Sequence, residues 1–165
     1  MEQHQLRLSD ICDYVIEQFD KNRKKPSMNK LIEFHTKNKY LFMAFSQVDL
    51  NELGNIIANN KKLPLSVVLS NYEHSLIVLL SKTPTRKRHA NVLRRMYGHF
   101  SKKLSNENRL IIETAISDYQ KNCVPLNDVL HKMRNMASDI DNLYLARQTY
   151  FLLFSDKTSF PKYAS

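Results

Sequence analysis

The chain has 165 residues, of which 42% are apolar and 25% are charged, so it fits one folded domain with a continuous core rather than a disordered polymer. Only two glycines and five prolines occur, which excludes the many tight turns of a β-sandwich or barrel. The formal net charge of +9 favours encounters with polyanions over encounters with cationic surfaces.

Apolar residues recur at helical spacing along the whole chain, and no stretch alternates as a strand would. We therefore expect an all-α fold, a compact single domain over residues 1–165 built as a bundle of about seven to eight helices. Residues 1–26 hold the N-terminal helix, and the tail at 155–165 is expected to fray. The predicted helices begin, in chain order, at Ser9, Ser27, Ser46 or Asp49, Pro64, Thr85, Ser105, just after Pro125 and near Asn142.

No segment has the pattern of a signal peptide or of a membrane span. Residues 1–10 are polar and mixed in charge, and no run approaches the roughly 18 apolar residues that a membrane helix needs. Cys12 and Cys123 lie far apart and match no zinc-binding spacing, which indicates reduced thiols. These features predict a cytoplasmic protein with no cofactor, no bound metal and no membrane partner.

The positive charge is concentrated around the helix predicted over residues 85–104. If Val92 and Phe100 face the core with their helical neighbours, the cations form a strip along the outer surface. Between Glu73 and Glu107 there is no acidic residue, whereas the interval holds eight cations: Lys82, Arg86, Lys87, Arg88, Arg94, Arg95, Lys102 and Lys103.

We interpret this strip as a surface for nucleic acid or another polyanion, because cations spaced along a helix can meet successive phosphates. The helix N-terminus at Thr85 can hold one more phosphate. The alternatives are a solvated charged face, although such faces usually mix signs, and a site for a small ligand that bears a phosphate. The candidate nucleic-acid-binding residues are Lys37, Lys39, Arg86, Lys87, Arg88, His89, Asn91, Arg94, Arg95, Lys102 and Lys103.

A second candidate surface lies at residues 33–40. Lys37 and Lys39 could extend the cationic surface, and His35 and Tyr40 could stack on a base. The alternative is an ordinary polar helix surface with a partly buried histidine. His89, just inside the basic helix, is open to the same two interpretations, a phosphate neighbour or a packed or capping residue.

Enzymatic motifs are largely missing from the sequence. There is no glycine-rich phosphate loop, no HExxH and no GxSxG, and two glycines in total exclude most strand-turn-helix nucleotide sites. None of the six histidines has a second histidine four residues away, so no helix face offers a metal two imidazoles.

Six strings of the sequence together resemble the YbgA-like family of small bacterial helical domains. The resemblance is strongest over residues 34–151, which is most of the chain. The strings are FHTKNKY at 34–40, ELG at 52–54, TRKRHANVL at 85–93, GHF at 98–100, VPL at 124–126 and YLARQTY at 144–150.

The resemblance carries expectations about function. Members of the family occur alone or joined to an iron–sulfur desulfidase domain that acts on thiouracil or thiolated tRNA, which implies that the helical part holds RNA. The present sequence lacks the clustered cysteines of an iron–sulfur centre, so that catalysis is not available to this chain alone. The shared strings also single out Asn91, Arg147, Gln148 and Tyr150, as part of a pocket or of a buried stabilising network.

Three hypotheses follow. The first is a non-catalytic RNA-binding module, for tRNA or a similarly folded RNA, that binds phosphates through the basic helix and could also use the surface at residues 33–40. The second is a small enzyme acting on a nucleotide or modified base. The third is an interaction partner of a separately encoded desulfidase, which an exposed apolar patch outside the basic face would favour. The pocket of the second hypothesis would be formed by His35, His89, Arg147, Gln148 and Tyr150.

Overall fold

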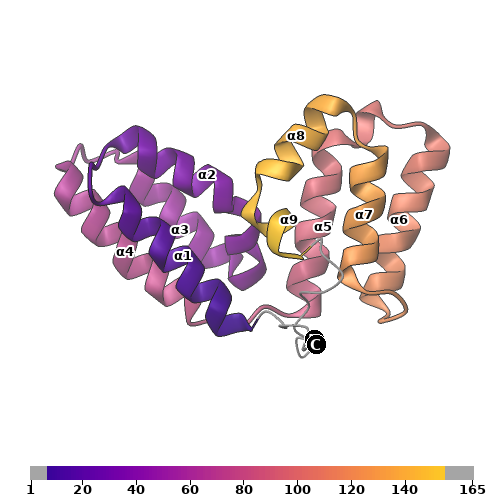
Figure 1. Ribbon diagram of the computed structural model, residues 1–165, viewed down its shortest axis with the longest axis horizontal. Helices are drawn as coiled ribbons and strands as arrows, with labels where there is room; N and C mark the ends of the chain where they lie inside the picture. Colours follow the sequence, from indigo (N-terminus) through magenta and orange to yellow (C-terminus); the bar gives the residue numbers. More distant parts are fainter. Residues whose placement is uncertain (1–6, 155–165) are drawn as a thin grey trace, which may run out of the picture.

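Nine α-helices and one short 3₁₀ helix make up the computed structural model, which describes residues 7–154, and this part of the chain contains no strand (Figure 1). The all-α fold expected from the sequence is confirmed. The tail at 155–165, predicted to fray, lies outside the described residues. The helices are α1 (Leu8–Asn22), α2 (Met28–Phe45), α3 (Gln47–Ala58), α4 (Leu65–Leu80), α5 (Arg86–Phe100), η1 (Ser101–Lys103), α6 (Asn106–Gln120), α7 (Leu126–Met136), α8 (Asp139–Arg147) and α9 (Thr149–Phe154).

The helices form two groups that meet at α2 (Figure 1). One group contains α1 to α4 and the other contains α5 to α8, while α9 packs against α2, α7 and α8. α2 also packs against α1, α3, α4 and α5. Because α2 has neighbours from both groups, every residue from Tyr40 to Phe45 is buried, and the polar face of an ordinary surface helix is missing there.

Aromatic rings fill the core of the first group. Phe19 of α1 lies edge-on to Phe34 of α2 at 5.6 Å between ring centroids and stacks on Tyr72 of α4 at 5.8 Å. Phe42, about two turns further along α2, makes a further ring contact with Phe34. Such pairs add to the burial of apolar area, so these rings fix how α1, α2 and α4 pack together.

Side-chain caps begin three of the helices at serine or threonine residues that the sequence predicts. Ser27, Thr85 and Ser105 each accept the backbone N–H three residues later, as the N-cap of α2, α5 and α6 respectively. The expected cap at Ser9 is wrong, because α1 already begins at Leu8. There the Asp10 carboxylate accepts the Arg7 backbone N–H at 2.9 Å, and this contact takes over the role of a serine cap.

The segment expected to form one helix from about Asn142 to Phe151 forms part of two. α8 begins earlier, at Asp139, and Gln148 then adopts an extended backbone with φ −76° and ψ 127°. The Gln148 side chain donates to the backbone carbonyl of Thr36 on α2 at 3.0 Å. This tertiary hydrogen bond explains the break, which turns α9 back onto α2.

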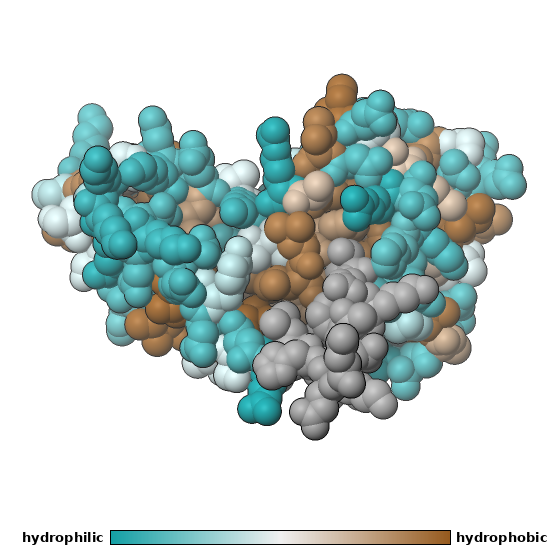
Figure 2. All heavy atoms as spheres, in the orientation of Figure 1, coloured by the Kyte–Doolittle hydropathy of each residue, from teal (hydrophilic) through white to brown (hydrophobic). Residues whose placement is uncertain are grey.

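Hydrophobic side chains gather on the surface over α8 and α9, whereas hydrophilic side chains cover the visible face of α1 and α2 (Figure 2). Ile140 and Leu143 lie three residues apart on one face of α8 and are 75% and 59% exposed. Leu152 on α9 is 55% exposed. An apolar surface therefore exists outside the basic helix.

Candidate nucleic-acid interface

The exposed face of α5 carries the cations that the sequence predicts. His89, Val92, Met96 and Phe100 are buried on the inner face, as the apolar spacing requires for the last three. Lys87, Arg94 and Arg95 are exposed and Arg88 is half-buried, and all four lie on the outer face. The strip exists, but its members differ in what surrounds them.

The strip borders a groove between α3 and α5 whose floor is α2. Its first hollow has a volume of about 770 Å³, and its second, of about 570 Å³, adjoins the first at Met43, Gln47 and Arg95. We call the two together the α3–α5 groove. The first hollow is lined by Met43, Ser46, Gln47, Val48, Thr85, Lys87, Arg88, Asn91, Arg94 and Arg95, and the second by His35, Lys39, Tyr40, Met43, Gln47, Leu50, Asn51, Gly54, Asn55, Arg95 and His99.

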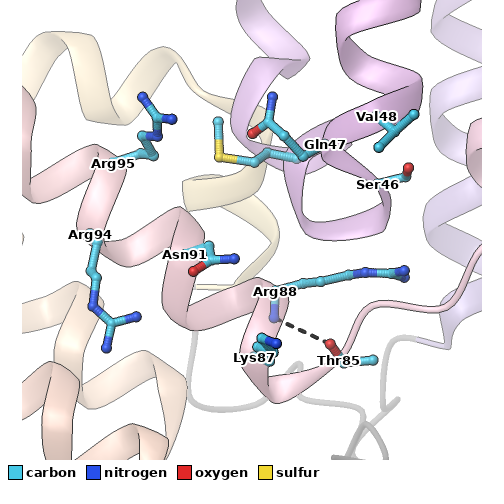
Figure 3. A pocket seen from close by; sticks show the side chains of 10 residues that line it. Ser46, Gln47, Val48, Thr85, Lys87, Arg88, Asn91, Arg94 and Arg95 are labelled. Atoms are coloured by element: carbon cyan, nitrogen blue, oxygen red, sulfur yellow. Dashed lines mark hydrogen bonds between the residues drawn. The ribbon is translucent and has the colours of Figure 1, made fainter.

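The lining residues of the groove include five cations and no carboxylate. Arg88, Asn91 and Arg95 lie on the α5 side of the first hollow, opposite the residues that begin α3 (Figure 3). Among the ion pairs of residues 7–154, none involves Arg88 or Arg95, although Arg88 donates to the backbone carbonyl of Thr83 at 2.8 Å. Concave surfaces lined by one sign of charge focus the field and attract the opposite charge.

One predicted nucleic-acid contact is wrong because burial removes it from the surface, and a second is half-buried. His89 is 1% exposed, so its ring cannot meet a phosphate in solvent. The Arg86 guanidinium lies over the Tyr119 ring at 5.7 Å, and its Nε and Nη1 atoms are buried. The inward orientation of both side chains follows from helix geometry, since positions 86, 89 and 93 fall on neighbouring turns of the inner face.

Other predicted cations are exposed but lie outside the groove or have partners. Lys37 and Lys102 are exposed and do not line either hollow. Lys103 donates to the Asp141 carboxylate at 3.2 Å, and Arg94, although at the rim, donates to the Gln120 amide oxygen. The groove thus collects Lys39, Lys87, Arg88, Asn91, Arg94 and Arg95 from the predicted residues.

The five residues of the predicted pocket do not share one cavity. His35 lines the second hollow, and its Nδ1 lies 3.0 Å from the Tyr72 hydroxyl. His89 instead pairs with the Tyr150 hydroxyl at 2.7 Å, and both side chains are buried. Gln148 is buried and its side chain is hydrogen-bonded to α2, whereas Arg147 is exposed on α8. Gln148 and Tyr150 are buried, as the buried-network interpretation expects, whereas its other two residues, Asn91 and Arg147, are exposed.

Burial controls the protonation of the two histidines. It lowers the pKa of His89 to about 3, so the imidazole is neutral at physiological pH. Burial and the nearby Lys39 ammonium lower the pKa of His35 below its usual value. Burial also raises the pKa of Tyr72, the hydroxyl partner of His35. Both histidines therefore enter their hydrogen bonds as uncharged rings.

A cluster around Asp141 was not predicted from the sequence. The Asp141 carboxylate accepts from the Ser138 hydroxyl at 2.6 Å and from Lys103, and His99 Nε2 lies 3.8 Å away. The hydrogen bond from Ser138 and the Lys103 ammonium hold the pKa of Asp141 below its usual range. The carboxylate therefore fixes the end of η1 and His99 against the start of α8.

Replacing Asp141 with alanine should destabilise the protein by about 1–3 kcal/mol, because the carboxylate is 2% exposed and its partners lose their acceptor. Urea unfolding followed by circular dichroism measures the change. Asp139→Ala is the matched control, since Asp139 lies in the same helical turn but is exposed. It should cost less than about 0.5 kcal/mol, and equal costs would contradict a specific role for Asp141.

The described residues contain neither a cluster that could hold a metal ion nor a helix that could cross a membrane. Over residues 7–154, no three histidine, cysteine or acidic side chains come together in a way that could hold a metal ion. Within the same range, no helix has the length and apolar character needed to cross a bilayer. The α3–α5 groove, with its five lining cations, is therefore the candidate site.

The fold and the groove define an all-helical protein with a cationic groove between two groups of helices. The chain belongs to the family described as "Protein of unknown function (DUF1722)", whose model matches residues 39–155 and so includes most of the groove. It is also 26% identical over 125 residues to the uncharacterized protein YbgA of Escherichia coli (strain K12), a match that covers 75% of this chain and 74% of that protein. The expected YbgA-like family is thereby confirmed. No solved structure is detectably similar.

Proposed function

We propose that this protein is a non-catalytic RNA-binding module that holds tRNA, or an RNA of similar fold, in the α3–α5 groove. The observation that carries the proposal is the composition of the groove, which has five lining cations and no lining carboxylate. RNA offers a matching row of phosphates, and each neutralised phosphate releases counterions. The proposal places the protein in the cytoplasm, with RNA as its partner.

The shape of the site supports RNA over a flat polyanion contact. The cations come from two elements, Lys39 from α2 and Lys87, Arg88 and Arg95 from α5, and they surround a concave space. A folded RNA can insert a convex segment of its backbone into such a space, and thereby meet the cations of the α5 wall and Lys39 of the α2 floor at once. A linear polyanion gains less from this arrangement.

The test is binding of purified protein to bulk tRNA, duplex DNA and heparin between about 50 and about 200 mM salt, measured by fluorescence anisotropy. We expect tRNA to bind tightest, with log K falling against log salt with a slope of about −3, as about four phosphate contacts imply. Equal binding of all three polyanions would mean that the groove binds anionic polymers of any kind. Absence of tRNA binding would overturn the proposal.

The second candidate is an interaction partner of a separately encoded desulfidase, favoured by the exposed apolar surface on α8. Ile140 and Leu143 are large, highly exposed and adjacent on one helix face, outside the groove. Exposed apolar patches of this kind mark protein interaction sites. The salt series separates the two candidates, because a protein partner on α8 requires no affinity of this chain for tRNA.

A further inference from the structure

The two walls of the α3–α5 groove carry different chemistry. On the α3 wall stand three amides, Gln47, Asn51 and Asn55, each four residues from the next and therefore on one face of the helix. Gln47 Nε2 donates to Asn51 Oδ1 at 2.9 Å, which orients both amides. Each amide offers both a donor and an acceptor, which is the mixture that the edge of a nucleobase presents.

The α5 wall carries cations in a parallel row. Arg88, Asn91, Arg95 and His99 follow one another at spacings of three, four and four residues, so they lie on one face of α5. The two arginines are suited to phosphate, because the guanidinium fork matches phosphate oxygens. A strand in the groove therefore meets charge on one side and neutral hydrogen-bonding groups on the other.

An imidazole ring lies at the far end of the α5 row. His99 stacks on Tyr144 of α8, with ring centroids 4.2 Å apart and 20° between planes, and the His99 side chain is still 43% exposed. Tyr144 in turn donates to the Tyr40 hydroxyl at 3.4 Å, and His99 lies next to buried Asp141. The ring is thus held in place while part of it faces the second hollow.

We infer that the second hollow takes an unpaired nucleobase of RNA, stacked on His99 and hydrogen-bonded along its edge by the α3 amides, with the strand's phosphates on Arg88 and Arg95. Its volume of about 570 Å³ falls within the roughly 300–1,000 Å³ of small-molecule sites. Side chains reach base edges in loops and ends, where bases are unstacked, and not in an A-form duplex. The inference rests on the proposed function and adds a preference for unpaired RNA.

The wild-type protein is tested against four probes by fluorescence anisotropy or competition. They are an unstructured RNA of about twelve nucleotides, the same RNA annealed to its complement, an abasic strand of equal length and free nucleoside monophosphate. We expect the unstructured RNA to bind at least about five-fold tighter than the duplex or the abasic strand, because only it offers a base to stack. Free nucleotide should compete weakly, since it lacks the neighbouring phosphates.

Two variants assign the preference to the groove. His99→Ala and the double variant Asn51→Ala with Asn55→Ala should each weaken binding of the unstructured RNA by about five-fold or more. Binding of the abasic strand should stay unchanged. The matched controls are His74→Ala on α4 and Asn135→Ala on α7, which replace exposed residues that line neither hollow. Unchanged abasic binding also demonstrates that each variant is folded, independently of its effect on the base.

The failure of this inference and the failure of the proposed function give different results. If the wild type binds the unstructured, duplex and abasic strands equally, and the variants change nothing, the base site is overturned while RNA binding through phosphates stands. If only free nucleotide binds, the hollow is a small-ligand site and the RNA strand is excluded. If no probe binds at all, both the proposed function and the base site are overturned.

Discussion

Lowering the pH from 7 to 5 should reduce the free energy of unfolding by about 2 kcal/mol, chiefly because of His89. The ring is buried and neutral in the folded protein, with a pKa of about 3, whereas in the unfolded chain it titrates near 6.5. Between these values the unfolded chain binds more protons. Stability is therefore full above about pH 6.5 and falls as the pH decreases toward 3.

The size of the effect follows from the slope of about 1.4 kcal/mol per pH unit for one proton. His35 adds in the same direction, because burial and Lys39 also lower its pKa. Asp141 acts at lower pH, since its pKa is depressed: its contribution is full above the pKa of an unfolded aspartate, about 3.9, and is lost as the pH falls from there through the depressed value. Urea unfolding at pH 7, 6 and 5 measures the total.

His89→Gln isolates the contribution of this ring, because glutamine does not titrate. The variant's stability at pH 7 is lower than that of the wild type, since the contact with the Tyr150 hydroxyl is altered, but its pH dependence between 7 and 5 should be much flatter. His74→Gln, at an exposed position on α4, should leave the slope as it is in the wild type. If the stability of His89→Gln fell between pH 7 and 5 as steeply as that of the wild type, another group would dominate the pH dependence.

Local signals in the sequence predict the helices well. Ser27, Thr85 and Ser105 cap the predicted helices because an N-cap depends on residues within one turn. The break at Gln148 was not predicted, because its cause is a bond to Thr36, more than a hundred residues earlier in the chain. Long-range hydrogen bonds leave no periodic trace in the sequence.

The candidate site was predicted in part. The cations of α5 were found because charge accumulates there without acids, but the inner position of Arg86 was not separated from the strip, and for His89 the packed interpretation was only one of two. The spacing of His89 to Val92 and Met96 already places it on the apolar face. The opposite wall, from Gln47 to Asn55, was missed because which helix faces α5 is a tertiary property.

Reversing the charge of Arg88 and Arg95 together should weaken tRNA binding by about 100-fold or more at about 150 mM salt. The double variant Arg88→Glu with Arg95→Glu replaces two attractions for phosphate with two repulsions inside a groove that has no lining carboxylate of its own. The slope of log K against log salt should also become shallower by about 1.5, because two phosphate contacts are lost.

The variant is expected to fold, which makes the binding loss interpretable. Neither arginine is in an ion pair within residues 7–154, and a glutamate at position 88 lies in the first turn of α5, where the helix dipole favours a negative charge. Circular dichroism and urea unfolding should therefore resemble those of the wild type, apart from the bond between Arg88 and the Thr83 carbonyl.

The matched control must change the net charge by the same amount without touching the groove. Lys121→Glu with Lys132→Glu meets this requirement, because both lysines are exposed, on the α6 and α7 side, and line neither hollow. If binding depends on the groove, the affinity of the control for tRNA should fall by less than about three-fold at the same salt, since distant charges are screened beyond roughly 8 Å. Equal losses in the two variants would mean that tRNA responds only to total charge, and the α3–α5 groove would no longer be its binding site.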